Sequence, residues 1–383
     1  MHSTQADGAG HDEVGLLELA REWGRIGCTG FGGPPVHIAL LRELCVVRRQ
    51  WLTSVQFERA IAATNILPGP ASTQLAIYCA WRLRGLRGAL LGGACFILPG
   101  LIAIIALAAL FLSGSPPDWL RGAGMGAGAA VAAVAARAGL DLAGPIWTSA
   151  TAHRRPRVLA YGLAGALAAA ISGPWLVLVL LGCGLFELVG RGLFRWPLLI
   201  GAVKAGGTLA LAWSALKIGA LAFGGGFVIV PLLQSDAVNT YHWMSHAQFL
   251  DAVALGQVTP GPLVQTVAVV GYAAAGVPGA LLAALVAFSP SFSFILLGAP
   301  RFERLLANER ALRFLAGAGP AAVGAIIGSA IPLAGALSRT WQYALLPCAA
   351  LALLVARRGI VPTLLAAGCA GVIAVLFGAP ITP

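Results

Sequence analysis

Charged side chains are scarce in this sequence. Only 10% of its 383 residues are Asp, Glu, Lys or Arg, whereas 58% are hydrophobic. An ordinary soluble domain carries about 25% charged residues, and a soluble fold for this chain would need one giant apolar core. The sequence therefore predicts a protein that lies in lipid. Residues 1–13 are polar and no basic region precedes an apolar one, so we expect no cleaved signal peptide.

Clusters of metal ligands or nucleophiles are also missing. The seven cysteines are scattered singly, without metal-ligand or redox spacing, and are expected to be small apolar core residues. His, Asp and Glu form no cluster, which leaves an intramembrane enzyme or a membrane scaffold as a remote alternative. We expect no metal, no cofactor and no nucleic-acid partner, because a net charge of +11 in such a chain is typical of cytoplasmic loops.

Long charge-free runs take the place of a soluble core. Gly88–Leu112, Phe314–Ser338 and Gly359–Pro383 are each 25 residues long, more than the roughly 20 that cross a bilayer core. Ala252–Pro300 contains no charge over 49 residues and must fold back on itself. The sequence predicts an all-α integral membrane protein with about 10–12 membrane helices.

Two Pro-Gly-Pro motifs interrupt this apolar pattern. The first lies in Asn65-Ile-Leu-Pro-Gly-Pro-Ala-Ser-Thr-Gln74 and the second in Gln257-Val-Thr-Pro-Gly-Pro-Leu-Val-Gln-Thr266. Proline removes a backbone donor and clashes with the preceding turn, so one helix should end near Ile66 and another begin near Pro70. Broken helices at membrane depth expose N–H groups and a partial positive charge that suit an anion.

The second half of the chain repeats the first. A constant spacing of 192 residues relates Phe31-Gly32-Gly33 to Phe223-Gly224-Gly225, and Pro68-Gly69-Pro70 to Pro260-Gly261-Pro262; a spacing of 191 relates Pro99 to Pro290. Duplication of this kind marks a transporter whose site lies where the broken helices of the two repeats meet. The predicted domains are residues 1–196 and 197–383, with re-entrant segments at the Phe-Gly-Gly motifs.

Matching loops differ in charge. Arg42, Arg48 and Arg49 correspond to Gln234, Thr240 and Tyr241, and the basic loop around 82–87 corresponds to a neutral stretch at 273–278. Because cytoplasmic loops carry the excess of Lys and Arg, we expect the repeats to be inverted. Further helices are predicted over 14–30, about 119–140, 158–171 and 175–189, the last two forming a hairpin around 172–174.

Two cations occupy equivalent positions, and each would be costly inside lipid. Arg25 and Lys217 both lie six residues before a Phe-Gly-Gly motif, and together they would neutralise a dianion. Alternatively, Arg25 pairs with Glu22 and snorkels, whereas Lys217 has no acidic residue within two helical turns. Arg137 and Asp141, four residues apart, are expected to form a helix-stabilising pair.

The remaining candidates surround the motifs. Their glycines either let the backbone approach an ion or permit tight helix crossing, and His37 either handles ions or is structural. The candidate substrate-binding residues are Arg25, Gly32, Gly33, Asn65, Gly69, Ser72, Thr73, Gln74, Lys217, Gly224, Gly225, Gln257, Gly261, Gln265 and Thr266.

The motifs resemble those of a known family. Phe-Gly-Gly-Pro-Pro-Val-His at 31–37, Leu-Pro-Gly-Pro-Ala-Ser at 67–72, Ala-Phe-Gly-Gly-Gly at 222–226 and Pro-Gly-Pro at 260–262 resemble the chromate ion transporter family in its long, two-domain form. The resemblance implies export of chromate from the bacterial cytoplasm across the inner (plasma) membrane and chromate resistance, with sulfate as the look-alike substrate. A transporter or channel for sulfate or another oxyanion is the alternative. The expected partners are the substrate anion, the lipid bilayer and a second copy of the chain in a homodimer.

Overall fold

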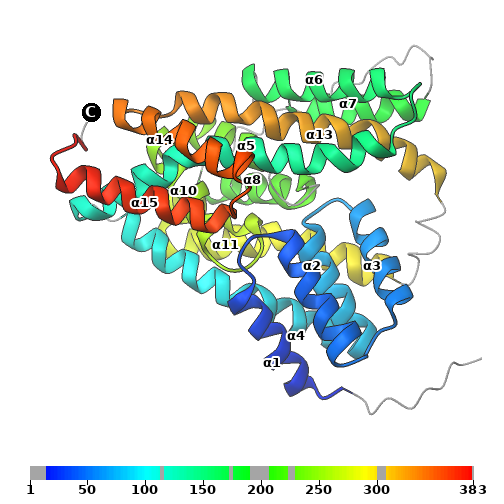
Figure 1. Cartoon of the computed structure of the whole chain (residues 1–383). Coiled ribbons are helices and arrows are strands. Elements are labelled where there is room, and N and C mark those ends of the chain that lie inside the picture. Colours follow the sequence, from blue (N-terminus) through cyan, green and yellow to red (C-terminus); the bar gives the residue numbers. More distant parts are fainter. Residues whose placement is uncertain are drawn as a thin grey trace, which may run out of the picture.

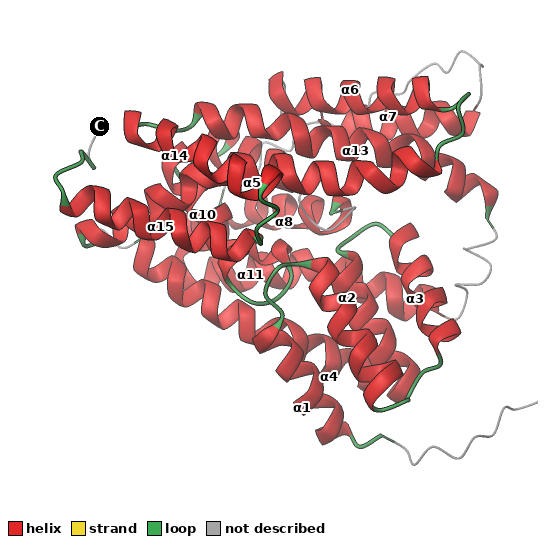
Figure 2. Ribbon diagram, in the orientation of Figure 1, coloured by secondary structure: helices red, strands yellow, loops and turns green. Residues whose placement is uncertain are grey.

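The structure, a computed structural model, describes residues 14–112, 116–171, 176–189, 207–222, 229–299 and 308–381. Within these ranges all regular structure is helical (Figure 2). The first repeat contains α1 (Leu16–Thr29), α2 (Pro34–Arg42), η1 (Glu43–Arg48), α3 (Ser54–Ile66), α4 (Ala71–Phe111), α5 (Asp118–Ser149), α6 (Arg155–Ile171) and α7 (Leu176–Val189). The second contains α8 (Thr208–Leu221), α9 (Ile229–Gln234), η3 (Ser235–Thr240), α10 (His246–Val258), η4 (Leu263–Gln265), α11 (Thr266–Gly298), α13 (Glu309–Gly335), α14 (Thr340–Ala350), η6 (Leu351–Val355) and α15 (Ile360–Leu376). The all-α prediction is confirmed.

The duplication is visible in the helix ends. Helices α8 and α10 begin and end 192 residues after α1 and α3, and the π-helical turn η3 follows η1 at the same spacing. Thr53 and Gln56 form a reciprocal capping box at the start of α3, and Ser245 and Gln248 form the same box at the start of α10. These boxes satisfy orphan backbone donors at each helix start, so the same local chemistry builds both repeats.

Helix α4 folds back on itself. Its helical dihedrals are interrupted at Arg84 and Gly85, and Gly85 has a φ of +57°. Across this turn Gly88 lies so close to Ala80 that a Cβ on Gly88 would overlap the Ala80 carbonyl oxygen. Helix α11 repeats the arrangement at Ala275–Gly276. The basic loop predicted at 82–87 is thus reduced to a tight turn between two antiparallel arms, because small residues let the arms touch.

Equivalent helix pairs form the centre of the molecule. Helix α1 packs on α4 and α8 on α11, and α4 also packs against α11 (Figure 1). At each crossing a glycine meets a backbone carbonyl: a Cβ on Gly27 would lie 2.6 Å from the Phe96 oxygen, and Gly219 meets Ala287 in the same way. Small residues allow such close backbone approach in lipid.

The later helices of each repeat pack against helices of the other repeat. Helix α13 packs against α6 and α7, while α5 packs against α14 and α15 (Figure 1). Gly165 and Gly126 lie against the backbones of α13 and α15 at these crossings. Each repeat therefore covers the other. The predicted boundary at 196 and the predicted hairpin turn at 172–174 lie outside the described residues.

Four helical stretches are long and apolar enough to cross a membrane in the part of the chain that the structure describes: Ala71–Phe111, Asp118–Ser149, Leu263–Gly298 and Leu312–Gly335. Four shorter apolar helices accompany them: Leu176–Leu188, Thr208–Leu221, Thr340–Val355 and Ile360–Leu376. The multi-pass membrane fold is confirmed. The total of about ten to twelve membrane helices and the inverted arrangement stay predictions.

Candidate functional site

Both Pro-Gly-Pro motifs break the helix as predicted. Helix α3 ends at Ile66 and α4 begins at Ala71; α10 ends at Val258, and the short turn η4 precedes α11. The central glycines have φ values of +121° at Gly69 and +100° at Gly261. Backbone in this region strains any residue with a Cβ, so glycine is needed in both loops.

Each loop lies against the long helix of the other repeat. A Cβ on Gly100 of α4 would overlap the carbonyl oxygen of Pro260, and a Cβ on Gly69 would come within 3.3 Å of Ser291 Oγ in α11. Gly100 and Ser291 occupy equivalent positions, 191 residues apart and one residue after a helix-interior proline. Each motif therefore lies against the other repeat. That the substrate site lies there stays a prediction.

His37 connects the two motifs. Its Nε2 lies 2.9 Å from the carbonyl oxygen of Gly30, and its Nδ1 lies 3.3 Å from Ser72 Oγ in the first turn of α4. The same Gly30 oxygen accepts a 3.0 Å hydrogen bond from the backbone N–H of Gly261. His37 is fully buried and meets Phe96 edge-on. Both ring nitrogens are thus occupied by protein groups, which favours the structural reading of His37.

The first turns after the two motifs are buried and polar. Ser72, Thr73, Gln74, Gln265 and Thr266 are each at most 1% exposed. Gln74 Nε2 donates to the Pro68 oxygen at 2.6 Å, and Gln265 Nε2 donates across the repeats to the Ile97 oxygen at 2.8 Å. These two amides hold the loops in place.

Several buried polar atoms near these loops have no hydrogen-bond partner in the described structure: Thr73 Oγ1, Gln74 Oε1, Gln257 Nε2, Gln265 Oε1 and Ser291 Oγ. No side chain caps the start of α4 either. Buried polar atoms are almost always hydrogen-bonded in folded proteins. Two hydroxyls, one amide N–H₂ and a helix N-terminus therefore remain able to donate hydrogen bonds to a ligand.

Lys217 has a partner that the sequence pattern did not reveal. Its Nζ lies 2.7 Å from Asp236 Oδ2, and Ser214 Oγ donates to the same carboxylate at 2.6 Å. No acidic residue lies within two helical turns of Lys217 along the sequence, but Asp236 reaches it from η3. The charge of Lys217 is therefore compensated by the protein.

The first repeat has a similar link with the charges reversed. Glu22 of α1 accepts hydrogen bonds from Arg48 at 2.8 Å and from Arg49 at 2.9 Å, both near η1. Burial by itself raises the pKa of the Glu22 carboxyl, but the two guanidinium groups outweigh it and hold the pKa below its usual value. Glu22 is therefore paired with these arginines and not with Arg25. The expected Arg137–Asp141 pair is present at 2.8 Å.

The remaining predicted site residues are not among the buried polar side chains that the structure describes. Arg25 and Asn65 are exposed, and Arg25 lines an open cavity of about 650 Å³ with Glu18, Arg21, Glu22 and Arg49. Gly32 and Gly33 have φ values of +105° and +77° and shape the turn before α2. Gly224 and Gly225 lie outside the described residues.

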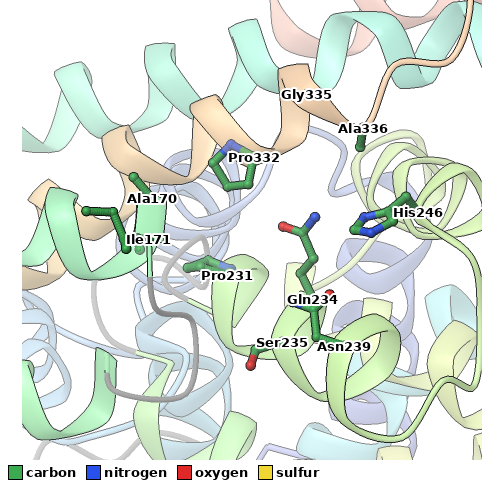
Figure 3. A pocket seen from close by; sticks show the side chains of 11 residues that line it. Ala170, Ile171, Pro231, Gln234, Ser235, Asn239, His246, Pro332, Gly335 and Ala336 are labelled. Carbon is green, nitrogen blue, oxygen red and sulfur yellow. The ribbon is translucent and has the colours of Figure 1, made fainter.

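A second polar cavity, of about 420 Å³, lies between the repeats. Gln234, Ser235 and Asn239 line it from α9 and η3, His246 from the start of α10, and the ends of α6 and α13 complete it (Figure 3). The Gln234 side chain points into the space between Pro332 and His246 (Figure 3). Sequence reasoning missed this cavity and also Ser291, although Ser291 directly follows the duplicated proline and could have been found by that signal.

Comparisons with known proteins agree with the motifs. The family model for the chromate transporter matches residues 17–188 and 209–374. The chromate transport protein of Cupriavidus metallidurans is 31% identical, over 93% of this chain and 92% of the relative. The chromate transport protein of Pseudomonas aeruginosa is 31% identical, over 81% of this chain and 79% of the relative. An uncharacterised transporter of Methanocaldococcus jannaschii is 25% identical, over 76% of this chain and 78% of the relative. No solved structure matches the chain. The chain therefore belongs to the chromate transporter family.

Proposed function

We propose that this protein is a secondary transporter that exports chromate from the bacterial cytoplasm across the inner membrane and thereby gives chromate resistance. The observation that carries the proposal is the set of buried polar atoms without partners in the described structure, on or next to the two Pro-Gly-Pro loops and the long helices that these loops contact. The names of the relatives, which are transport proteins, fit transport better than catalysis.

The chemistry of this group suits a tetrahedral oxyanion. Such an ion loses its water shell on entry and needs several donors in exchange. The hydroxyls of Thr73 and Ser291, the amide of Gln257 and the uncapped N-terminus of α4 are available donors, and the N-terminal end of a helix attracts negative charge. Sulfate has the same shape and charge, so the same donors make sulfate the competing substrate.

The cavity around Gln234 supports a path for the ion. Its polar lining consists of neutral amides, a hydroxyl and His246, and no carboxylate lines it. Ser235 Oγ is a further buried atom without a hydrogen-bond partner in the described structure. An anion would meet donors there and no like charge.

The membrane potential is a sufficient driving force for export. One elementary charge moving through about 100 mV changes the free energy by roughly 2.3 kcal/mol, so a dianion that leaves a negative cytoplasm gains roughly 4.6 kcal/mol. Inverted vesicles with this protein should accumulate labelled chromate when a lumen-positive potential is imposed with potassium and valinomycin, without a pH gradient.

The control is the same membrane without the protein, and excess unlabelled sulfate measures the competing substrate. Failure of the vesicles to accumulate chromate under an imposed potential would contradict the proposal. Linear uptake that does not saturate would instead indicate a channel.

A further inference from the structure

Asp251 is a carboxyl group in apolar surroundings. It belongs to α10, which packs against α5 and α15, and it lines a cavity of about 200 Å³ between these helices. The other residues that line this cavity are Phe111, Ala123, Gly124, Ala127, Ala254, Leu255, Val258, Leu364, Leu365, Gly368, Cys369 and Val372. None of them carries a charge or a strong hydrogen-bond donor.

The carboxyl also has no partner within the described structure. No hydrogen bond or ion pair involves Asp251, in contrast to Asp236 and Glu22, which are both bonded to cations. A carboxylate that is buried without a cation or donors is strongly disfavoured, and such a group takes up a proton instead. The surroundings of Asp251 therefore favour its neutral, protonated form.

Charged groups on the neighbouring helices lie elsewhere. Helices α11 and α15 contain no charged residue, and Cys369 is the one other titratable group on the cavity wall. On α5, Arg137 is paired with Asp141, and Asp118 and Arg121, near the start of that helix, are not part of the wall. Helix α4, which contributes Phe111 to the wall, carries its arginines near the turn at Arg84 and Gly85 and not on the wall. Among the described residues that line the cavity there is therefore no cation to stabilise the ionised form.

The backbone of α5 makes room for the carboxyl. A Cβ on Gly124 would lie 2.7 Å from Asp251 Oδ1, which is closer than a Cβ atom approaches a non-bonded oxygen. Gly128 faces the same side chain one turn later. At the equivalent position of the first repeat stands Arg59, which is exposed. Among these two equivalent positions, the partly buried carboxyl thus belongs to the second repeat.

We propose that Asp251 is a proton-binding site that takes up and releases one proton in each transport cycle, in exchange for the exported anion. The neutral acid fits the closed packing of α10 against α5 and α15, and the ionised form requires water to enter this contact. Helix α10 leads directly to Gln257 and the second Pro-Gly-Pro loop, so a movement of α10 reaches the anion site. The entry of the proton then adds to the membrane potential as a driving force for anion export. The proposal rests on the transport function proposed above.

Proteoliposomes with an internal pH-sensitive dye test this coupling. Chromate flux and proton flux are measured together at alkaline pH, with the potential clamped by potassium and valinomycin. We expect chromate and protons to move in opposite directions with the wild type, proton movement to fall to background with Asp251→Asn, and Asp251→Glu to retain it. Asp118→Asn, which removes an exposed carboxyl of α5, is the matched control and should behave as the wild type does.

Unchanged proton movement per chromate in Asp251→Asn, or chromate flux without proton flux in the wild type, overturns the proton site but not the transport function. Absence of any chromate flux in the wild type contradicts the transport function itself. If the wild type shows no chromate flux, or if Asp251→Asn is inactive, infrared spectra of the purified wild type and of Asp251→Asn test whether Asp251 binds a proton. A protonated-carboxyl band that Asp251→Asn loses supports the site, and identical carboxyl bands in both proteins overturn it.

Discussion

At the scale of single residues, several buried polar side chains connect separate elements in the described structure. His37 connects Gly30 with Ser72, and Gln265 connects its loop with α4. The ion pairs of Glu22 and Lys217 tie the first helix of each repeat to the π-helical turn that follows. The atoms left without partners therefore stand out as candidates for binding the ion.

Replacement of His37 by alanine should destabilise the protein and abolish export. The change leaves the Ser72 hydroxyl without this partner and loosens the link through Gly30 between the two motifs. A buried polar group left unsatisfied costs about 1–3 kcal/mol. The midpoint of thermal unfolding in detergent and chromate uptake in vesicles measure the two effects. His153→Ala, at an exposed position, is the control, and wild-type transport in His37→Ala would remove His37 from the site's framework.

A double-mutant cycle separates two roles of Lys217. Lys217→Ala leaves Asp236 buried without its cation, which typically costs about 3–5 kcal/mol, so we expect a low protein level and no chromate resistance. Because the pair is compensated within the protein, Lys217→Ala combined with Asp236→Ala should recover much of the protein level and of the resistance. A stable double variant without transport would instead assign the charge of Lys217 to the ion.

At the scale of elements, glycines at helix crossings decide how the broken helices meet. Gly100 and Gly69 bring the two Pro-Gly-Pro loops against α4 and α11, and Gly27 and Gly219 seat α1 and α8 on the same pair. Small residues at crossings let backbones come within reach of each other. The alternative that many of the glycines permit close backbone approach therefore fits Gly27, Gly100 and Gly219, whereas Gly69 is required by its φ of +121°.

Gly100→Ala should abolish export. The added methyl group would overlap the Pro260 carbonyl oxygen, which belongs to the backbone and cannot rotate away. Helix α4 would have to move from the second Pro-Gly-Pro loop. Gly24→Ala inside α1, where a Cβ would have as its nearest neighbour the Cys95 oxygen at 3.9 Å, an ordinary contact, is the matched control and should keep transport, since alanine suits a helix better than glycine by about 1 kcal/mol. Uptake in vesicles compares the two, and equal activity would contradict the close contact.

At the scale of the whole molecule, the two repeats are interlocked. Helix α5 of the first repeat is covered by α14 and α15, and α13 of the second by α6 and α7. Neither half buries its own apolar surface alone, so we expect the halves to fold together. The paired arrangement around α4 and α11 suits alternating access, in which two related repeats move about a central site.

The predicted inverted orientation is testable with reporters. One fused in the 42–50 segment should report the cytoplasm, because Arg42, Arg48 and Arg49 gather there, and one in the 235–246 segment should report the periplasm. Alkaline phosphatase and green fluorescent protein fusions at both points give opposite signals in that case. The same sign from both would contradict the inverted repeats and leave the transport proposal untouched.

The sequence by itself determined the class of protein, the helix ends at both Pro-Gly-Pro motifs, the duplication and the family, because these follow from composition, proline chemistry and spacing along the chain. The tertiary structure decided the rest. Asp236 reaches Lys217 from another element, Ser291 meets Gly69 across the repeats, and Asp251 lies in an apolar cavity built from several helices. Such neighbours depend on how helices pack, and a pattern read along one helix cannot contain them.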